Sequence, residues 1–222
     1  MKSRFSLILI ACVVIFGGIL VFTKKDSKTP SSSDAQPTNH LRGATNSKVT
    51  LVEYGDFQCP ACEAYYPIVE QAFDKYKADV TFQFRSFPIT SKHQHALAAH
   101  RVAEAADKQG KFWEMYKLLY EGQPTWSPES GTALSSDQVS QIFTGYAQQL
   151  GLNMTQFNTD RNSSSVNDII NADTKAGTNA PDGGVTGTPT FYLNGKKIDS
   201  TKIRGQDDFN KLIDDAIKAS KQ

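Results

Sequence analysis

The sequence has very few cysteines: its 222 residues include three, Cys12, Cys59 and Cys62. Cys12 lies in an apolar stretch near the N-terminus, so the rest of the chain contains a single pair. One pair cannot form the framework of several disulfides that stabilises many small secreted proteins. No second pair is present to complete a four-cysteine zinc site. Any chemistry of Cys59 and Cys62 is therefore that of an isolated pair.

The sequence also lacks an excess of charge of either sign. Lys and Arg total 24 and Asp and Glu total 23, interspersed along the chain, which gives a net charge of +1. Proteins that bind nucleic acids through phosphates concentrate Lys and Arg on one surface. We therefore expect no nucleic-acid partner. The 39% of hydrophobic residues is an ordinary share for a globular protein with its own core.

One long hydrophobic run is present, at the N-terminus. Residues 5–22 carry no charge, and basic residues flank them on both sides. About 20 apolar residues cross a bilayer as a helix. Residues 1–23 are therefore predicted to be a signal anchor with one transmembrane helix. This places the remainder of the chain at the cell membrane, outside the cytoplasm.

Two alternatives for this run remain open. A cleaved signal peptide would need a small-residue cleavage site, which is not clear here. A lipoprotein signal ending at Cys12 would need a polar stretch after that cysteine, but the following residues are apolar. Both alternatives also export the chain. An anchor inserted in the reverse orientation would keep the rest of the chain in the cytoplasm, and the lysines that follow the apolar run permit this orientation.

The rest of the chain divides into a polar segment and a domain with regular hydrophobic patterns. Residues 24–47 are rich in Ser, Thr, Pro and Asn and contain no aromatic residue, so a flexible tether is predicted there. Residues 48–222 are predicted to form the folded domain. Strands are expected at residues 49–54, 80–87, 190–193 and 196–198, and helices at 65–76, 96–108, 112–120, 136–150, 162–176 and from 207 onward.

The order of these elements predicts an α/β fold with a mixed central sheet flanked by helices. The strand–helix–strand start favours parallel pairing of the first two strands. Asn194-Gly195, between the last two strands, favours an antiparallel hairpin.

The cysteine pair stands in the motif Cys59-Pro60-Ala61-Cys62, after a predicted strand and before a predicted helix. Pro60 suits the first helical turn, where its missing N–H is not needed. Cys59 is then expected at the helix N-terminus, where backbone N–H groups and the macrodipole stabilise a thiolate. A thiolate is both the attacking and the better leaving sulfur. We predict Cys59 as the nucleophile and Cys62 as the resolving cysteine of a redox-active disulfide, with no other cofactor.

A pair of cysteines at this spacing also occurs in zinc sites and in structural disulfides. Half of a zinc site would need further ligands, which His93, His95 and His100 could supply only if the fold brought them together. A structural disulfide gains little from closing so short a loop. Redox chemistry is favoured over both, and no metal site is expected.

Three segments, taken together, resemble DsbA-like members of the thioredoxin superfamily. They are residues 55–62 (GDFQCPAC), 95–120 and 185–198 (VTGTPTFYLNGKKI), in the family's order. The similarity covers nearly all of the chain from about residue 44. It implies a thioredoxin fold, a helical domain inserted at about residues 91–178, and thiol:disulfide exchange.

The resemblance assigns roles to three more residues. Pro189 matches the family's cis-proline beside the cysteines, and Thr188 would offer backbone groups to an extended substrate. Glu53 matches a buried acid that takes the proton of Cys62, which requires a pKa raised by burial. The alternative for Glu53 is a strand residue that faces water. Ala61 departs from the strongest oxidants, which have His there, so a less oxidising couple is expected.

Three functions follow from the resemblance. The favoured one is an oxidase that donates disulfides to exported proteins and is reoxidised by a membrane partner. The second is a membrane-tethered reductase or isomerase, of which the isomerase is disfavoured because no dimerisation domain precedes the motif. The third is a peptide-binding or folding-assistance module without redox turnover. The direction of electron flow, the substrates and the oligomeric state do not follow from the sequence.

Overall fold

The computed structural model describes residues 35–128 and 133–222. The predicted anchor at residues 1–23, with Cys12 in it, and the first part of the predicted tether lie outside these ranges. Within them, no helix is both long and apolar enough to cross a bilayer.

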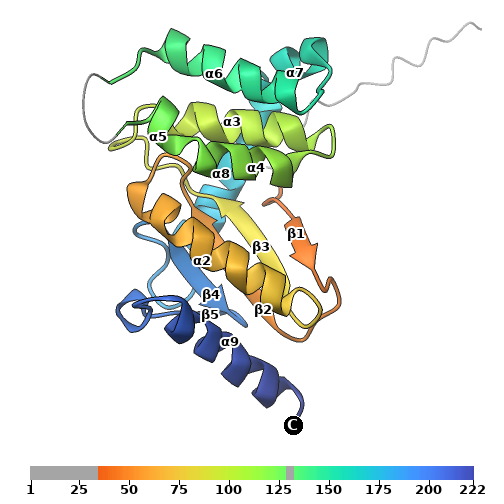
Figure 1. Cartoon of the computed structure of the whole chain (residues 1–222), viewed down its shortest axis with the longest axis vertical. Helices are drawn as coiled ribbons and strands as arrows, with labels where there is room; N and C mark the ends of the chain where they lie inside the picture. The colour runs from red at the N-terminus through yellow and green to blue at the C-terminus, as the bar shows by residue number, and fades with distance from the viewer. Residues whose placement is uncertain (1–34, 129–132) are drawn as a thin grey trace, which may run out of the picture. The chain divides into compact units, whose positions relative to one another are not determined.

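The centre of the fold is a five-stranded mixed sheet with the order β1-β3-β2-β4-β5 (Figure 1). β2 and β3 are parallel, and the other three neighbouring pairs are antiparallel. The parallel pair follows from the crossover helix α2 between β2 and β3. The predicted mixed sheet is thus confirmed. The strands are β1 (His40–Gly43), β2 (Thr50–Gly55), β3 (Thr81–Ser86), β4 (Thr190–Leu193) and β5 (Lys196–Lys197).

Helices α2 (Pro60–Tyr76) and α9 (Gln206–Ser220) share one hydrophobic core with the sheet. Both are amphipathic, and their buried residues recur at helical spacing, such as Val69 and Ala72 in α2. The core that they form with the sheet includes Leu51, Val69, Ala72, Phe82, Phe191, Phe209 and Ile213. Helix α2, which begins directly after Cys59, is held by this packing.

The chain between β3 and β4 forms the helical insertion, which gathers at one end of the sheet (Figure 1). Its helices are α3 (Ala96–Asp107), α4 (Phe112–Glu121), α5 (Gln123–Trp126), α6 (Ser136–Gln149), α7 (Met154–Arg161) and α8 (Ser164–Thr178). Two of them differ from the prediction. Helix α5 is a single turn in a segment predicted as a loop. Helix α7 lies outside the predicted helices, because it buries only Phe157 and so has no clear amphipathic pattern.

Strand β1 corrects the predicted tether at residues 24–47. His40 to Gly43 pair antiparallel with β3, and the Thr38 N–H donates to Asp173 Oδ1 of α8 over 2.7 Å. The folded domain therefore begins by Thr38 and not at residue 48. A four-residue strand whose partners lie far along the chain has no local hydrophobic signal, because its stability comes from tertiary hydrogen bonds.

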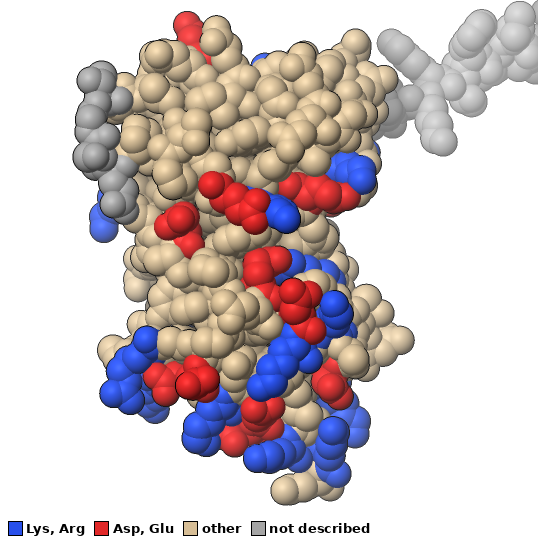
Figure 2. Space-filling view, in the orientation of Figure 1, with Lys and Arg blue, Asp and Glu red and all other residues tan. Residues whose placement is uncertain are grey.

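Charges of both signs are mixed on the surface that carries α2 and α9 (Figure 2). Ion pairs such as Lys75–Asp214 and Lys211–Asp215 account for part of this mixture. Fewer charged side chains are seen over α6 in the same view.

Candidate active site

Cys59 is the N-cap residue of α2, and Pro60 begins the helix. Its extended backbone (φ −74°, ψ 121°) turns the chain from the loop after β2 into the helix. The backbone N–H groups of Ala61 and Cys62 act on its sulfur, as expected for a helix N-terminus. Cys59 is 7% exposed, and Pro60 and Ala61 beside it are exposed.

These surroundings lower the pKa of the Cys59 thiol from 9.0 to about 5. The largest cause is a hydrogen bond from the Cys62 thiol, and burial acts in the opposite direction. The two backbone N–H groups lower the pKa of Cys59 further. The stabilisation that a histidine at position 61 would add is thus not needed for a thiolate at neutral pH.

Cys62 lies one turn along α2 and is completely buried. The backbone N–H of Asp56 donates to its sulfur over 3.5 Å. The pKa of Cys62 is raised above its usual value, first by burial and then by Cys59 and Glu53. The two cysteines therefore differ as a redox pair requires, with one stable thiolate and one thiol that resists ionisation.

The segment before β4 lies against Cys59, as the resemblance implied. The Cys59 thiol donates to the Thr188 carbonyl over 3.3 Å, and the Thr188–Pro189 peptide bond is cis. Residues 129 positions apart in the sequence thus meet at the sulfur.

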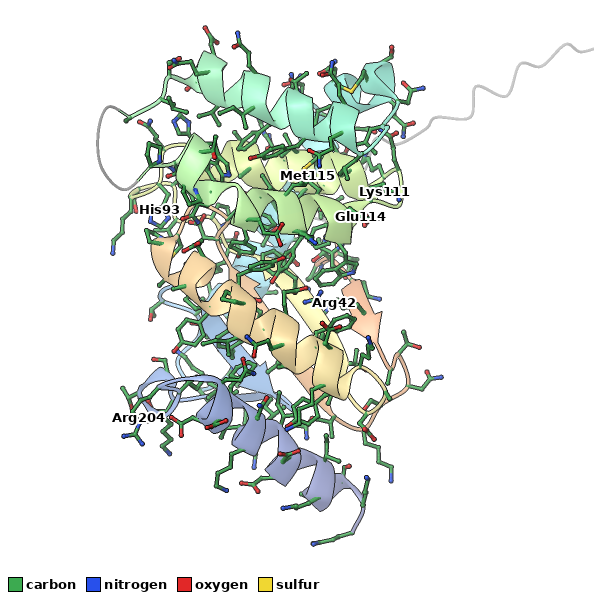
Figure 3. The ribbon with its side chains drawn as sticks, in the orientation of Figure 1. Arg42, His93, Lys111, Glu114, Met115 and Arg204 are labelled. Carbon is green, nitrogen blue, oxygen red and sulfur yellow. The ribbon has the colours of Figure 1, made fainter. Side chains whose placement is uncertain are left out.

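Glu53 lies in β2 and is 5% exposed, so the water-facing alternative is wrong. Burial raises its pKa to about 8, against the opposing effects of Arg42 and of a hydrogen bond from Tyr116. The Tyr116 hydroxyl donates to Glu53 Oε2 over 3.4 Å. Arg42 (labelled in Figure 3) is placed by cation–π contacts with Phe73, 4.1 Å away, and Trp113, 4.3 Å away. Glu53 is therefore protonated at neutral pH.

The three histidines do not converge on a metal site with the cysteines. His93 pairs with Asp56, His95 with the Leu134 carbonyl, and His100 with Ser86. In residues 35–128 and 133–222, no group of three or more His, Cys, Asp or Glu could hold a metal ion.

Asp56 is a site residue to which the sequence assigned no role. Its carboxylate is fully buried and accepts from the Gln58 and Ile89 N–H groups, each over 2.8 Å, and pairs with His93 Nδ1 at 2.7 Å. Figure 3 shows His93 beside the first turn of α2. An Asp directly after a strand and three residues before a helix cap is a local signal for such a loop anchor.

Gln123 of α5 is the second such residue. Its side-chain amide donates to the Phe57 carbonyl over 2.7 Å and to the Cys59 carbonyl over 3.2 Å. No sequence signal connects it to the cysteines, because the contact is made only when the helical insertion folds onto the loop.

The sequence model of the family described as thioredoxin matches residues 35–215. The chain belongs to the thioredoxin family. This match includes both cysteines, the Thr188–Pro189 segment and strand β1. It confirms a thioredoxin-like α/β fold.

Several solved structures share the fold of this chain. BdbD from Bacillus subtilis is 22% identical, with a TM-score of 0.65 over 83% of this chain and 97% of that one. The alpha-DsbA1 of Wolbachia pipientis is 19% identical, also with a TM-score of 0.65, over 86% and 98%. A thioredoxin-like oxidoreductase from Silicibacter pomeroyi is 22% identical, with a TM-score of 0.62 over 80% and 91%. These likenesses confirm the fold that the resemblance implied.

A different kind of relative is a Na(+)/H(+) antiporter, NhaA 1 of Salinispora arenicola. It is 34% identical over 164 residues, which are 72% of this chain and 22% of the antiporter. This thioredoxin-family chain spans about a fifth of the length of the curated relatives it matches. The similarity therefore concerns one segment of those longer proteins.

Proposed function

We propose that this protein is a thiol:disulfide oxidase that works outside the cytoplasm and introduces disulfides into exported proteins. The observation that carries the proposal is the pair of opposite pKa shifts at one helix start, downward at Cys59 and upward at Cys62. A low pKa of the exchanging sulfur stabilises the reduced form, and so makes the disulfide a stronger oxidant. Residues 1–23 would anchor the domain to the membrane.

The first step is attack on the Cys59–Cys62 disulfide. A substrate thiolate forms a bond to Cys59 Sγ, the Cys59–Cys62 bond breaks, and its electron pair leaves with Cys62. Glu53, protonated at neutral pH, gives its proton to the Cys62 sulfur. Both groups are buried, and the effect of Glu53 on the pKa of Cys62 supports this transfer.

The second step releases the oxidised substrate. A second substrate thiolate attacks the substrate sulfur of the mixed disulfide, and Cys59 leaves as a thiolate, which its low pKa favours. The substrate loses two electrons and the enzyme gains them. A membrane partner that accepts two electrons would then restore the enzyme disulfide.

An extended substrate strand would lie beside Thr188. The carbonyl of Thr188 already accepts from Cys59 in the dithiol form, so this backbone lies very near the reacting sulfur. Backbone hydrogen bonds of this kind bind peptides with little dependence on sequence.

The reduction potential of the Cys59–Cys62 couple tests the oxidase proposal. The full chain is equilibrated with glutathione buffers, and the reduced fraction is counted by thiol alkylation. We expect a value near that of the strong oxidants, about −120 mV, because the low pKa of Cys59 compensates for Ala61. A value near that of thioredoxin, about −270 mV, would reject the oxidase and favour a membrane-tethered reductase.

Replacement of the nucleophile separates redox turnover from simple peptide binding. Cys59→Ser should abolish disulfide donation to a reduced, unfolded protein substrate. Full retention of folding assistance by this variant would instead support the peptide-binding module.

A further inference from the structure

Tyr120, at the end of α4, has a hydroxyl group for which the fold provides no partner. The residue is fully buried, and within the described residues its oxygen has no hydrogen bond. Buried polar groups in proteins are nearly always paired, and an unpaired one needs an explanation. The thioredoxin fold itself does not need this hydroxyl, because a phenylalanine would fill the same space.

The hydroxyl lies at the end of β2, next to the backbone that contacts Cys62. A Cβ atom on Gly55 would stand 2.9 Å from the Tyr120 oxygen, so glycine at this position leaves room for it. The following residue, Asp56, donates its N–H to Cys62 Sγ. Tyr120 and Cys62 also belong to the same buried core.

The ring of Tyr120 is fixed in this position by its neighbours. Its centroid lies 5.0 Å from that of Phe57, 4.9 Å from that of Tyr116 and 5.4 Å from that of Tyr66. Three aromatic contacts of this kind hold the ring without any help from the hydroxyl.

The pKa of Tyr120 is consistent with this placement near Cys62. Burial is the largest cause of its raised pKa, and Cys62 comes next, ahead of Glu53, Tyr116 and Asp56. A thiolate at Cys62 would lie in this apolar core, where the hydrogen bond that its sulfur accepts from the Asp56 N–H is long, at 3.5 Å. Hydrogen bonds from preorganised donors are most valuable where charge develops in such a site.

We infer that the Tyr120 hydroxyl donates a hydrogen bond to the Cys62 sulfur whenever that sulfur carries negative charge during disulfide exchange. In the dithiol form Cys62 is neutral, and the hydroxyl is left unpaired. When the Cys59–Cys62 bond breaks, the electron pair moves to Cys62 and the hydroxyl becomes its donor, until Glu53 delivers a proton. By the same path in reverse, the hydroxyl stabilises Cys62 as it attacks a mixed disulfide. This inference rests on the exchange function proposed above.

The test is Tyr120→Phe in the full chain, with Tyr66→Phe as the matched control. Tyr66 belongs to the same aromatic cluster, but its hydroxyl bonds to Glu121 at the surface. Rates are measured in both directions, with dithiothreitol reducing the disulfide and oxidised glutathione oxidising the dithiol. We expect Tyr120→Phe to slow both reactions by about tenfold, the effect of one hydrogen bond to a charged group. The equilibrium constant with glutathione should stay within about twofold, because the neutral forms do not use the bond.

Three results would overturn the inference. The first is rates for Tyr120→Phe equal to those for Tyr66→Phe. The second is a change in only one of the two rates with a shifted equilibrium constant, which would indicate a structural effect on one redox state. The third is loss of folding, because a hydroxyl without a partner adds nothing to the stability of the dithiol form. If the unmodified chain exchanged no disulfides, the proposed function itself would be wrong. If the unmodified chain exchanged disulfides but Tyr120→Phe behaved like Tyr66→Phe, only the inference about Tyr120 would be wrong.

Discussion

Single side chains in this site owe their chemistry to burial more than to their immediate sequence neighbours. Cys59 and Cys62 have the same thiol, yet the pKa of one falls to about 5 and that of the other rises. Glu53, two positions before Gly55 in β2, has a pKa of about 8 because it is buried. Groups whose pKa values are displaced in opposite directions are typical of sites that move protons at neutral pH.

Glu53 should make stability depend on pH in a defined direction. Its pKa rises from 4.5 to about 8 on folding, so its contribution is fully present below 4.5 and is lost as pH rises through 8. We expect the oxidised chain to become less stable over this window, and Glu53→Gln to flatten the dependence. The free energy of unfolding in denaturant, measured at several pH values, tests this.

Glu121→Gln is the control for this experiment, because Glu121 is exposed and pairs with Lys117 at the surface. This variant should leave the dependence of the unfolding free energy on pH unchanged. An equally steep slope in Glu53→Gln and in the unmodified chain would show that Glu53 is not the group responsible.

Residues inside short motifs could be predicted from the sequence, and residues defined by burial could not. Cys59, Pro60 and the Thr188–Pro189 pair are in motifs that keep their order and context, and they meet where the resemblance placed them. The sequence leaves Glu53 ambiguous because Leu51 and Val52, which lie on opposite faces of β2, are both apolar, so the sequence does not show which face is buried. Tyr120 and Gln123 act through contacts that exist only after folding.

Among the helices and strands, those with strong periodicity can be predicted and those held by tertiary contacts cannot. Helices α2, α3, α4 and α9 lie within a few residues of their predicted bounds. Strand β1 and helices α5 and α7 are short and polar, and distant partners stabilise them. One of these elements, α5, nevertheless supports the candidate active site through Gln123.

Gln123→Leu should therefore affect Cys59 through the loop that carries it. The variant keeps the volume but leaves the Phe57 and Cys59 carbonyls without their amide donor. We expect a loss of about 1–3 kcal/mol in stability for these buried groups. The pKa of Cys59 should also rise, because the helix start is no longer held beneath its sulfur. Denaturant unfolding and thiolate absorbance against pH measure the two effects.

Gln109→Leu is the matched control, since Gln109 also bonds to backbone groups of the insertion, at Asn153, but far from the cysteines. An unchanged Cys59 pKa in Gln123→Leu would limit Gln123 to a stabilising role.

The described chain is joined into one unit at two places. Near the cysteines, Phe57 and Phe84 belong to the same core as Met115, Leu119 and Phe143 of the insertion. The second place is the fully buried carboxylate of Asp173 in α8. It accepts hydrogen bonds from the Thr38 N–H (2.7 Å), the Ser86 N–H (2.9 Å) and the Arg85 side chain (3.0 Å). This single carboxylate joins the insertion to β3 and to the segment before β1.

Because the sheet and the insertion share these groups, they should unfold together. Asp173→Asn replaces an acceptor of several N–H groups with an amide and leaves Arg85 without its partner, which costs about 3–5 kcal/mol for a buried pair. We expect Asp173→Asn to have one unfolding transition, destabilised by the same amount whichever probe follows it. Tryptophan fluorescence reports on Trp113 and Trp126 of the insertion, and hydrogen exchange reports on β2 and β3. Asp168→Asn, on the same helix, should leave the unfolding transition unchanged for both probes. Separate transitions for the two probes would mean that the insertion folds independently, and that the loop carrying Cys59 depends on the insertion only through local contacts such as that of Gln123.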